Sequence, residues 1–165
     1  MNSSQIEKVL IRRCRGQFLG VFAKDTMPRV LPMQRPILLV CNTDIKSLPG
    51  KHWIAIYIGK NHRGEFFDSF GRPPEPAFAQ FLARNCVGWI HNDRQLQSSV
   101  SYFCGQYCCF YYLYKSIDMD LLAIRSCLSN DTGLNDHMVH AFICNLLNAK
   151  FRILSVDVCV SLIKC

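Results

Sequence analysis

A cysteine followed by glycine stands at the start of the most apolar stretch of the chain. From Cys104 and Gly105 to Ser116 nearly every position is apolar or aromatic, which predicts a helix buried on most sides. Free N–H groups and the positive end of the dipole at a helix N-terminus favour a thiolate. We expect Gly105 to leave the space beside the sulfur open for a substrate backbone. Cys104 is therefore a candidate nucleophile, although a free cysteine taken alone is more often a packing residue.

Two further residues are of the types that a cysteine nucleophile needs. His52 begins one expected strand and Asp68 closes a neighbouring one, so a strand, a tight turn and a returning strand would bring them side by side. An imidazole can take the thiol proton, and a carboxylate can fix its tautomer and stabilise the imidazolium. Taken singly, His52 also fits a rim histidine without a role, and Asp68 a turn residue.

An amide side chain lies shortly before the candidate nucleophile. Gln97 precedes Cys104 in a polar loop, where its amide would stabilise an oxyanion together with the Cys104 N–H. Gln95 is the alternative donor, and a solvated loop glutamine is the alternative interpretation. Trp53, next to the proposed base, is expected either to cover the imidazole or to pack in the core.

The elements that must position these residues follow from the hydrophobic pattern. Short segments rich in β-branched and aromatic residues predict strands, and longer apolar or periodic segments predict helices. Strands are expected at 37–42, 52–58, 65–70, 89–92 and 151–165, with a short apolar stretch at 18–22. Helical segments are expected at 6–14, 77–85, 104–116, 121–128 and 137–147. Early hairpin strands followed by helices, without a repeat or linker, predict one α+β domain over 1–165, with 151–165 as its tail.

The composition excludes several classes of protein. The chain has 165 residues, half of them hydrophobic, which suffices for one folded core. No apolar run approaches the ~18 residues of a membrane span, and the polar start at 1–5 lacks the features of a secretory signal. Ten cysteines without a C-x-x-C pair indicate free thiols rather than disulfides or metal ligands. We expect an intracellular, non-secreted protein of the cytoplasm or nucleus of a host cell, or one packaged in a virus-like particle, without metal, cofactor or membrane contact.

Three segments together resemble a known family. They are His52-Trp53-Ile54-Ala55, Phe67-Asp68-Ser69-Phe70-Gly71, and Gln97 followed after six residues by Cys104-Gly105-Gln106-Tyr107-Cys108. Their order, spacing and flanking residues are similar to those of adenovirus-type cysteine endopeptidases (adenain-like proteases), and more distantly to those of SUMO/ubiquitin-like-protein proteases. The likeness runs from about Gln17 to Leu147. Within this family it is closest to the protease of Maverick/Polinton-type viruses or transposons.

This resemblance implies a fold and a set of roles. The fold is papain-like and α+β, with a small mixed or antiparallel sheet packed against helices and the nucleophile at a helix N-terminus. Cys104 would be the nucleophile, His52 the general base, Asp68 the orienting acid and Gln97 the oxyanion donor. Adenoviral members have Glu in place of Asp68, whereas the ubiquitin-like-protein proteases have Asp. The spacing of Gln97 to Cys104 is closer to the adenoviral pattern.

The resemblance also implies partners. Adenoviral members are stimulated by DNA and by a basic peptide that forms a disulfide with an enzyme cysteine. Cys86 lies at a similar distance before Cys104, and an ordinary packed thiol is the alternative. The net charge of +7 is compatible with DNA, but the basic residues are scattered, so a merely basic surface fits equally well. We expect a monomer that acts on a polypeptide.

Three functions remain open at this point. The first is a cysteine endopeptidase that hydrolyses peptide bonds in viral-type precursor or capsid proteins through a thioester. The second is a SUMO/ubiquitin-like-protein isopeptidase. Asp68 supports this function, whereas the spacing of Gln97 to Cys104 argues against it. The third, of another class, is an inactive protease-fold binding protein.

Overall fold

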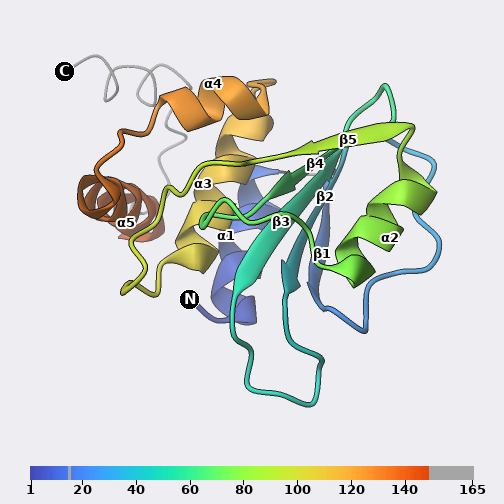
Figure 1. Ribbon diagram of the computed structural model, residues 1–165, viewed down its shortest axis with the longest axis horizontal. Helices are drawn as coiled ribbons and strands as arrows, with labels where there is room; N and C mark the ends of the chain where they lie inside the picture. Colours follow the sequence, from blue (N-terminus) through green and yellow to red (C-terminus); the bar gives the residue numbers. More distant parts are fainter. Residues whose placement is uncertain (15, 149–165) are drawn as a thin grey trace.

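A five-stranded mixed sheet lies between helices in the computed structural model, which describes residues 1–14 and 16–148 (Figure 1). The predicted strand at 151–165 lies outside the described residues. The strands are β1 (Phe18–Ala23), β2 (Ile37–Asn42), β3 (Trp53–Ile58), β4 (Arg63–Phe67) and β5 (Gly88–His91). The helices are α1 (Ser3–Arg13), α2 (Pro76–Asn85), α3 (Cys104–Lys115), α4 (Leu121–Ser126) and α5 (Thr132–Asn148).

The strands stand in the sheet in chain order, from β1 at one edge to β5 at the other. β2, β3 and β4 form an antiparallel meander in which Ala55 lies opposite both Val40 and Phe67. β1 runs parallel to β2, and β5 runs parallel to β4. The segment at 18–22, expected only as a short apolar stretch, is thus an edge strand outside the early hairpins, because the long connection at 24–36 crosses over and lets β2 start from the same end. The mixed sheet and the later helices confirm the predicted α+β class.

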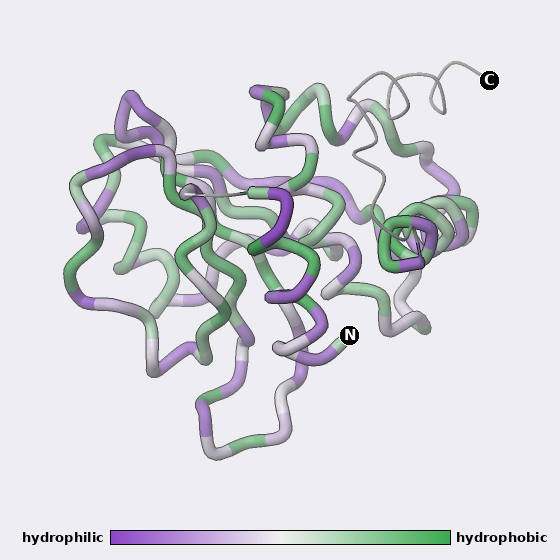
Figure 2. The backbone as a smooth tube through the Cα atoms, turned by 180° about the vertical axis from the view of Figure 1, so that it is seen from behind, coloured by the Kyte–Doolittle hydropathy of each residue, from purple (hydrophilic) through white to green (hydrophobic). Residues whose placement is uncertain are grey.

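The two faces of the sheet serve two cores, because side chains alternate along each strand. On β2, Leu38 and Val40 join the larger core, which also takes residues of α1, α3, α4 and α5. Ile37, Leu39 and Cys41 point to the other face, where the smaller core is closed by α2. Figure 2 shows hydrophobic stretches in the interior of the molecule and many hydrophilic ones along the outer loops. All six residues of β2 are buried as a result.

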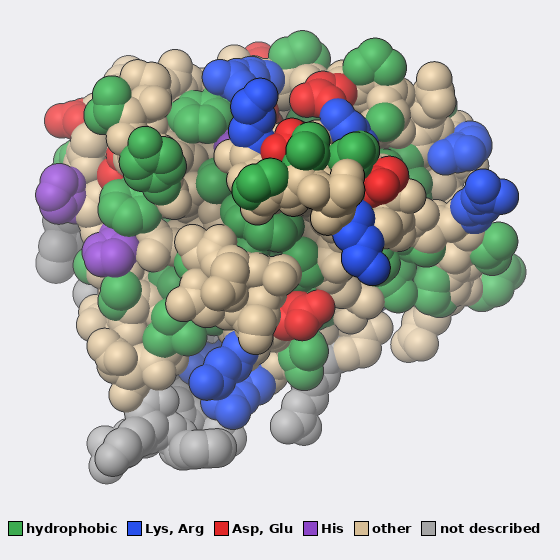
Figure 3. Space-filling view, turned by 90° about the horizontal axis from the view of Figure 1, so that it is seen from below, with side chains coloured by type: hydrophobic (Ala, Val, Ile, Leu, Met, Phe, Trp, Pro, Cys, Tyr) green, Lys and Arg blue, Asp and Glu red, His purple; other side chains and the backbone are tan. Residues whose placement is uncertain are grey.

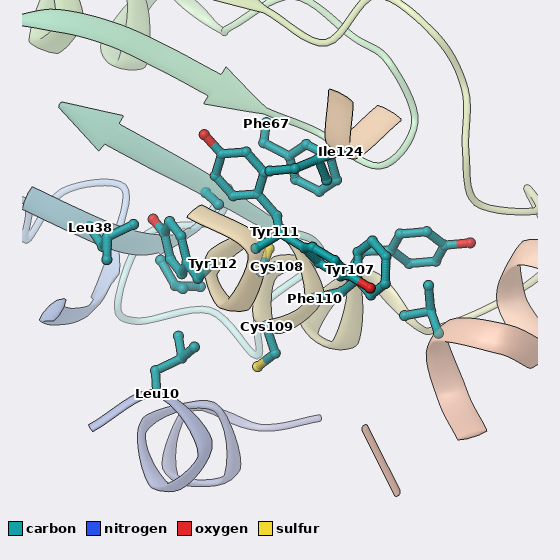
Figure 4. Close-up of a cluster of buried hydrophobic side chains, with 14 of the residues drawn as sticks. Leu10, Leu38, Phe67, Tyr107, Cys108, Cys109, Phe110, Tyr111, Tyr112 and Ile124 are labelled. Carbon is teal, nitrogen blue, oxygen red and sulfur yellow. The ribbon is translucent and has the colours of Figure 1, made fainter. Parts of the chain in front are cut away.

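Helix α3 lies inside the larger core and sends side chains outward in several directions (Figure 4). Its buried residues run from Gly105 to Tyr112, with Tyr114 and Lys115 at the far end. The Tyr112 hydroxyl reaches the sheet, where it lies 2.7 Å from the carbonyl of Ile56, contacts that of Leu39, and accepts the Ile56 N–H at 2.9 Å. A buried phenol must find such partners. These bonds fix the height of α3 relative to β3, and with it the position of Cys104.

Helix α5 begins five residues before the expected start at His137. Asp131 caps it, since its carboxylate accepts the Leu134 N–H at 3.0 Å and its carbonyl accepts the Asn135 N–H. The cap lies upstream of the apolar pattern on which the prediction rested, and Gly133 within the first turn hid the start. None of the helices in the described ranges has the length and apolar character needed to cross a membrane.

Candidate active site

Two buried side chains meet at the end of the sheet where β3 begins and β4 ends. His52 directly precedes β3, and Asp68 directly follows β4. His52 Nε2 lies 2.7 Å from Asp68 Oδ1, and the two side chains are 10% and 5% exposed. The Phe70 N–H donates to the same carboxylate oxygen at 2.8 Å. The antiparallel pairing of β3 with β4 thus gives an imidazole one fixed carboxylate partner.

The loop before His52 is held by a single buried amide. Asn42, the last residue of β2, accepts the N–H groups of Asp44 at 2.9 Å and Lys51 at 3.1 Å through Oδ1. Gly50 lies directly against this amide with φ +93°, and a Cβ there would come within 2.8 Å of Asn42 Nδ2. The Thr43 N–H donates to the carbonyl of His52 at 2.9 Å. The turn therefore requires glycine, and it fixes the backbone of His52.

The turn after Asp68 is held in the same way. Buried Asn92 donates through Nδ2 to the carbonyls of Asp68 and Arg94, both at 2.8 Å. Gly71 has φ +70°, and a Cβ there would lie 2.5 Å from the backbone of Arg94. Sequence reasoning missed Asn42 and Asn92, because a lone polar residue at a strand end gives no signal of its partners.

Cys104 is the first residue of α3 and reaches the His52–Asp68 pair from the opposite side. Its half-buried sulfur is in hydrogen-bond contact with His52 and with the backbone N–H groups of Trp53 and Gly105. His52 Nε2 is already bound to Asp68, so Nδ1 is the ring nitrogen left for the sulfur. Phe103, before the helix, supplies no side-chain cap. Its carbonyl accepts the Gln106 N–H at 2.8 Å, which leaves the Gly105 N–H to the sulfur.

These contacts shift two pKa values toward a charged pair. Burial opposes both charges, since it raises the pKa of the Cys104 thiol and lowers that of the His52 imidazole. The hydrogen bond to His52, the two backbone N–H groups and the charge of His52 outweigh burial and lower the thiol pKa below its ordinary value. Hydrogen bonds and charge from Asp68 and Cys104 raise the pKa of His52 to about 9. The arrangement shifts the pair toward thiolate and imidazolium.

The neighbouring cysteines have the opposite environment. Cys108 and Cys109 lie inside α3, where burial raises the pKa of both thiols, to about 12 for Cys109. Burial also raises the pKa of Cys14 to about 11 and that of Cys41 further. These residues behave as small hydrophobic side chains, whereas Cys104 is placed for ionic chemistry.

Gly105 has a different role from the expected one. The space at its α-carbon is not open to a substrate, because a Cβ there would lie 3.2 Å from Ile6 Cδ1 and Met1 Cβ and 3.3 Å from Trp53 Cδ1. Trp53 Nε1 donates to the carbonyl of Met1 at 3.1 Å, which closes the same side. Glycine allows α1 to approach α3 directly behind the nucleophile.

The ring that lies against the imidazole is that of Phe70, with centroids 4.8 Å apart. The guanidinium of Arg72 in turn lies 4.8 Å from the centre of the Phe70 ring. Trp53 faces Met1 and Gly105 and packs against the larger core, so the second of the two expectations for it, a core residue, is confirmed. The Phe-x-Arg sequence after Asp68 gave no signal, since neither residue type is reactive.

Gln97 is fully buried between the acid and the nucleophile. Its Oε1 accepts the Ser69 hydroxyl at 2.7 Å, and its Nε2 donates to the carbonyl and hydroxyl oxygens of Ser101 at 2.9 and 3.0 Å. Gln95, the alternative donor, is exposed and donates to the carbonyl of Gln97 at 2.9 Å. The amide of Gln97 thus links the turn after Asp68 to the segment that enters α3.

Cys86 and the basic side chains are the features suggested for partners. Cys86 ends α2 and packs half-buried against Gly64, and burial raises the pKa of its thiol. On the face shown in Figure 3, basic side chains form separate groups with acidic ones between them. Among the described residues, no group of three or more His, Cys, Asp or Glu side chains is placed to hold a metal ion.

Comparison with known proteins places the fold. No protein-family model matches the sequence. The ASFV pS273R protease is similar in one crystal structure with a TM-score of 0.63 and 17% identity, over 84% of this chain and 66% of that chain. A selenomethionine crystal structure of the same protease has a TM-score of 0.50 and 23% identity, over 64% of this chain and 43% of that chain. Effector protein Cdu1 of Chlamydia trachomatis, solved bound to ubiquitin, has a TM-score of 0.48 and 15% identity, over 90% of this chain and 78% of that chain.

The chain spans less than two thirds of the length of the ASFV protease in either crystal structure. At these identities the likeness concerns the fold. The resemblance to adenovirus-type and Maverick/Polinton proteases that the motifs suggest has no counterpart among these structures. The chain has the papain-like cysteine protease fold, with an imidazole, a carboxylate and a thiol converging at the N-terminus of its buried helix.

Proposed function

We propose that this chain is a cysteine peptidase that cleaves amide bonds in polypeptides, with Cys104 as nucleophile. One observation carries the proposal. The Cys104 sulfur contacts an imidazole that is itself bound to a buried carboxylate 2.7 Å away, and its thiol pKa is lowered despite burial. A half-buried thiol with no chemical role has no need of such partners.

The reaction follows from the geometry. The thiolate of Cys104 attacks the scissile carbonyl carbon, and the π electrons move to the carbonyl oxygen. The tetrahedral intermediate collapses as the C–N bond breaks, and the leaving amine takes the proton from His52 Nδ1. A thioester remains on Cys104. Neutral His52 then accepts a proton from water, whose oxygen attacks the thioester and releases the acid and the thiolate. Asp68 holds the ring throughout through Nε2.

The oxyanion needs donors, and Gln97 is proposed as one of them with the Cys104 N–H. Both Nε2 hydrogens are bound to Ser101 in the absence of substrate. The Ser101 hydroxyl is the exchangeable partner, because it has a second bond to the carbonyl of Ser98 at 3.2 Å. An oxyanion is a stronger acceptor than a hydroxyl and would replace it.

Covalent labelling tests the nucleophile. A tagged iodoacetamide at neutral pH should label the wild type at Cys104 within minutes, and Cys104→Ala should lose both the label and the cleavage of a library of fluorogenic peptides. Cys127→Ala is the matched control, because burial raises the pKa of that half-buried thiol. Equal labelling of wild type and Cys104→Ala would refute the assignment. Labelling without any cleavage would favour the inactive binding protein.

Two substrate classes remain, each with one observation in its favour. Gln97 stands at the adenovirus-like spacing, and the best-fitting neighbour reported above is a viral protease by name, which supports cleavage of viral-type precursor or capsid proteins. The acid at position 68 is Asp, as in ubiquitin-like-protein proteases, which supports an isopeptidase. Release of a C-terminal fluorophore from ubiquitin or SUMO by wild type, but not by Cys104→Ala, would select the second class. Cleavage of short internal peptides alone would select the first.

Two activating partners are proposed from the resemblance. DNA is proposed as an activator on the strength of the net charge of +7, and a basic peptide on the position of Cys86. Stimulation of peptide cleavage by DNA that disappears at high salt would support the former. Stimulation by a cysteine-containing basic peptide that is absent in Cys86→Ser would support the latter.

A further inference from the structure

The segment that carries Gln97 is held from two sides. On one side, the N–H groups of Leu96 and Gln97 both donate to the carbonyl of Ser69, at 2.8 and 3.0 Å. On the other side, the segment meets buried polar groups of α3 and α5. Asn135 Nδ2 donates to the carbonyl of Leu96 at 3.0 Å, and the Ser98 N–H donates to Asp136 Oδ2 at 3.3 Å.

Asp136 is the centre of the second group. It is 5% exposed, and its Oδ1 accepts the hydroxyl of Tyr107 at 2.9 Å while Oδ2 accepts the Ser98 N–H. Among the ion pairs of the described residues, none includes Asp136. Burying a carboxylate with only neutral donors costs folding free energy. Asp136 is therefore a candidate for a role other than stability.

The position of Tyr107 suggests that reason. It is three residues after Cys104, so the two side chains leave neighbouring positions of the same face of α3. Burial and then Asp136 raise the pKa of the phenol, which therefore remains a donor. Its hydroxyl also lies 3.0 Å from the carbonyl of Leu96. One carboxylate thus joins the nucleophile's helix to the segment that carries Gln97.

We propose that Asp136 is a positioning residue that sets the amide of Gln97 at the oxyanion position through Ser98 and Tyr107. This inference rests on the proposed peptidase function. It predicts a defect in transition-state stabilisation without a defect in the thiolate, because the Asp136 carboxylate accepts from Ser98 and Tyr107, whereas His52 is bound to Asp68. Displacement of an oxyanion donor by a fraction of an ångström is enough to slow turnover.

The variant Asp136→Asn tests this with little change of shape. Its carbonyl can still accept from Tyr107, but its amide turns a donor toward the Ser98 N–H. We expect kcat to fall by about tenfold with KM within about twofold, and the rate of Cys104 alkylation by iodoacetamide to stay at the wild-type value. Gln97→Ala alone should lower kcat by about 100-fold. Asp136→Asn added to it should change kcat by less than about twofold, since both act on one donor.

Glu65→Gln is the matched control. Glu65 is also a largely buried carboxylate that accepts a tyrosine of α3, with Tyr111 at 2.6 Å and Lys115 at 2.8 Å, but at the far end of the helix from Cys104. The Glu65→Gln variant should have a lower melting temperature than wild type and a kcat within about twofold of it. Tyr107→Phe serves as a second variant if Asp136→Asn does not fold, and should show the same loss of kcat with unchanged alkylation.

The outcomes separate the two proposals. Wild-type turnover that depends on Cys104, with full activity in Asp136→Asn, would overturn this inference and leave the peptidase intact. A tenfold loss that multiplies in full on Gln97→Ala, or that accompanies slower alkylation, would also overturn it. Failure of the wild type to turn over any substrate through Cys104 would remove the peptidase function and this inference with it.

Discussion

The pKa of the Cys104 thiol reflects two opposing effects, burial and hydrogen bonding. Burial alone would keep the thiol protonated, as it does for Cys108 four residues further along the same helix. The difference between the two is that Cys104 has an imidazole and two N–H groups beside its sulfur. Each pKa unit corresponds to about 1.4 kcal/mol. A few hydrogen bonds of ordinary strength are therefore enough to decide which of two cysteines on one helix is reactive.

The pH dependence of the rate of Cys104 alkylation should show how these two effects set the thiol pKa. In the wild type the midpoint should lie below the ordinary thiol pKa, because the imidazolium and the N–H groups stabilise the thiolate. His52→Ala should move the midpoint to or above the ordinary value, since burial then acts without its main counterweight. His137→Ala, which removes an exposed imidazole of α5, should leave it unchanged. A His52→Ala midpoint equal to that of wild type would contradict the pairing.

Peptide cleavage should depend on pH in two limbs. The leaving amine takes its proton from the imidazolium, so kcat/KM should fall as pH rises through about 9, where His52 loses that proton. It should also fall at acid pH as Cys104 becomes protonated, below the ordinary thiol value. An alkaline limb that is unchanged in His52→Lys, with residual activity, would show that another group supplies the proton.

At the scale of the elements, the contact between α1 and α3 stands directly behind the nucleophile. Gly105→Ala tests it, because the new Cβ would lie 3.2 Å from Ile6 and Met1 and 3.3 Å from Trp53. Overpacking of this kind costs about 1–3 kcal/mol, which exceeds the gain of about 1 kcal/mol in helix propensity. We expect a lower melting temperature and, because Trp53 donates its backbone N–H to the sulfur, slower alkylation of Cys104.

Gly88→Ala is the control for that experiment. Gly88 has no atom within 4 Å of its Cβ position, and its φ lies outside the positive range that disfavours side chains. The substitution should leave melting temperature and alkylation within experimental error of wild type. If Gly105→Ala melted at or above the wild-type temperature, the close packing of α1 on α3 would not hold in solution.

The elements also show what the sequence pattern predicts well and what it does not. Helix α3 was expected within one residue at its end, because a run that is apolar on every side has few alternatives to a buried helix. The parallel partner of β1 was not expected, because alternation reveals that a strand has two faces but not which strand lies beside it. Gly105 was misread for a related reason: a missing side chain indicates a close approach without naming what approaches.

The site shows the same limit. The residue types of His52, Asp68 and Cys104 predict a site, and the structure brings the three side chains together. Phe70 and Asn92 contact His52 and the backbone of Asp68, and Asp136 holds the segment of Gln97 through a hydrogen bond from Ser98, 38 residues away in the chain. Such contacts depend on the packing of α5 and the turn after β4, which no local pattern of the sequence contains.

At the scale of the whole molecule, the sheet separates two cores with different consequences for the site. The core around α3 includes the helix that carries Cys104, whereas the core under α2 contacts only the opposite face of the sheet. Phe81→Ala, at a position of α2 that is 1% exposed, should lower the free energy of unfolding by about 3–5 kcal/mol. The pH midpoint of Cys104 alkylation should stay at the wild-type value, because β3 and α3 keep their contacts through Tyr112. Phe110→Ala removes a side chain of equal size from the core around α3, so it should change both the free energy of unfolding and the pH midpoint. A shifted midpoint in Phe81→Ala would show that the two cores are coupled.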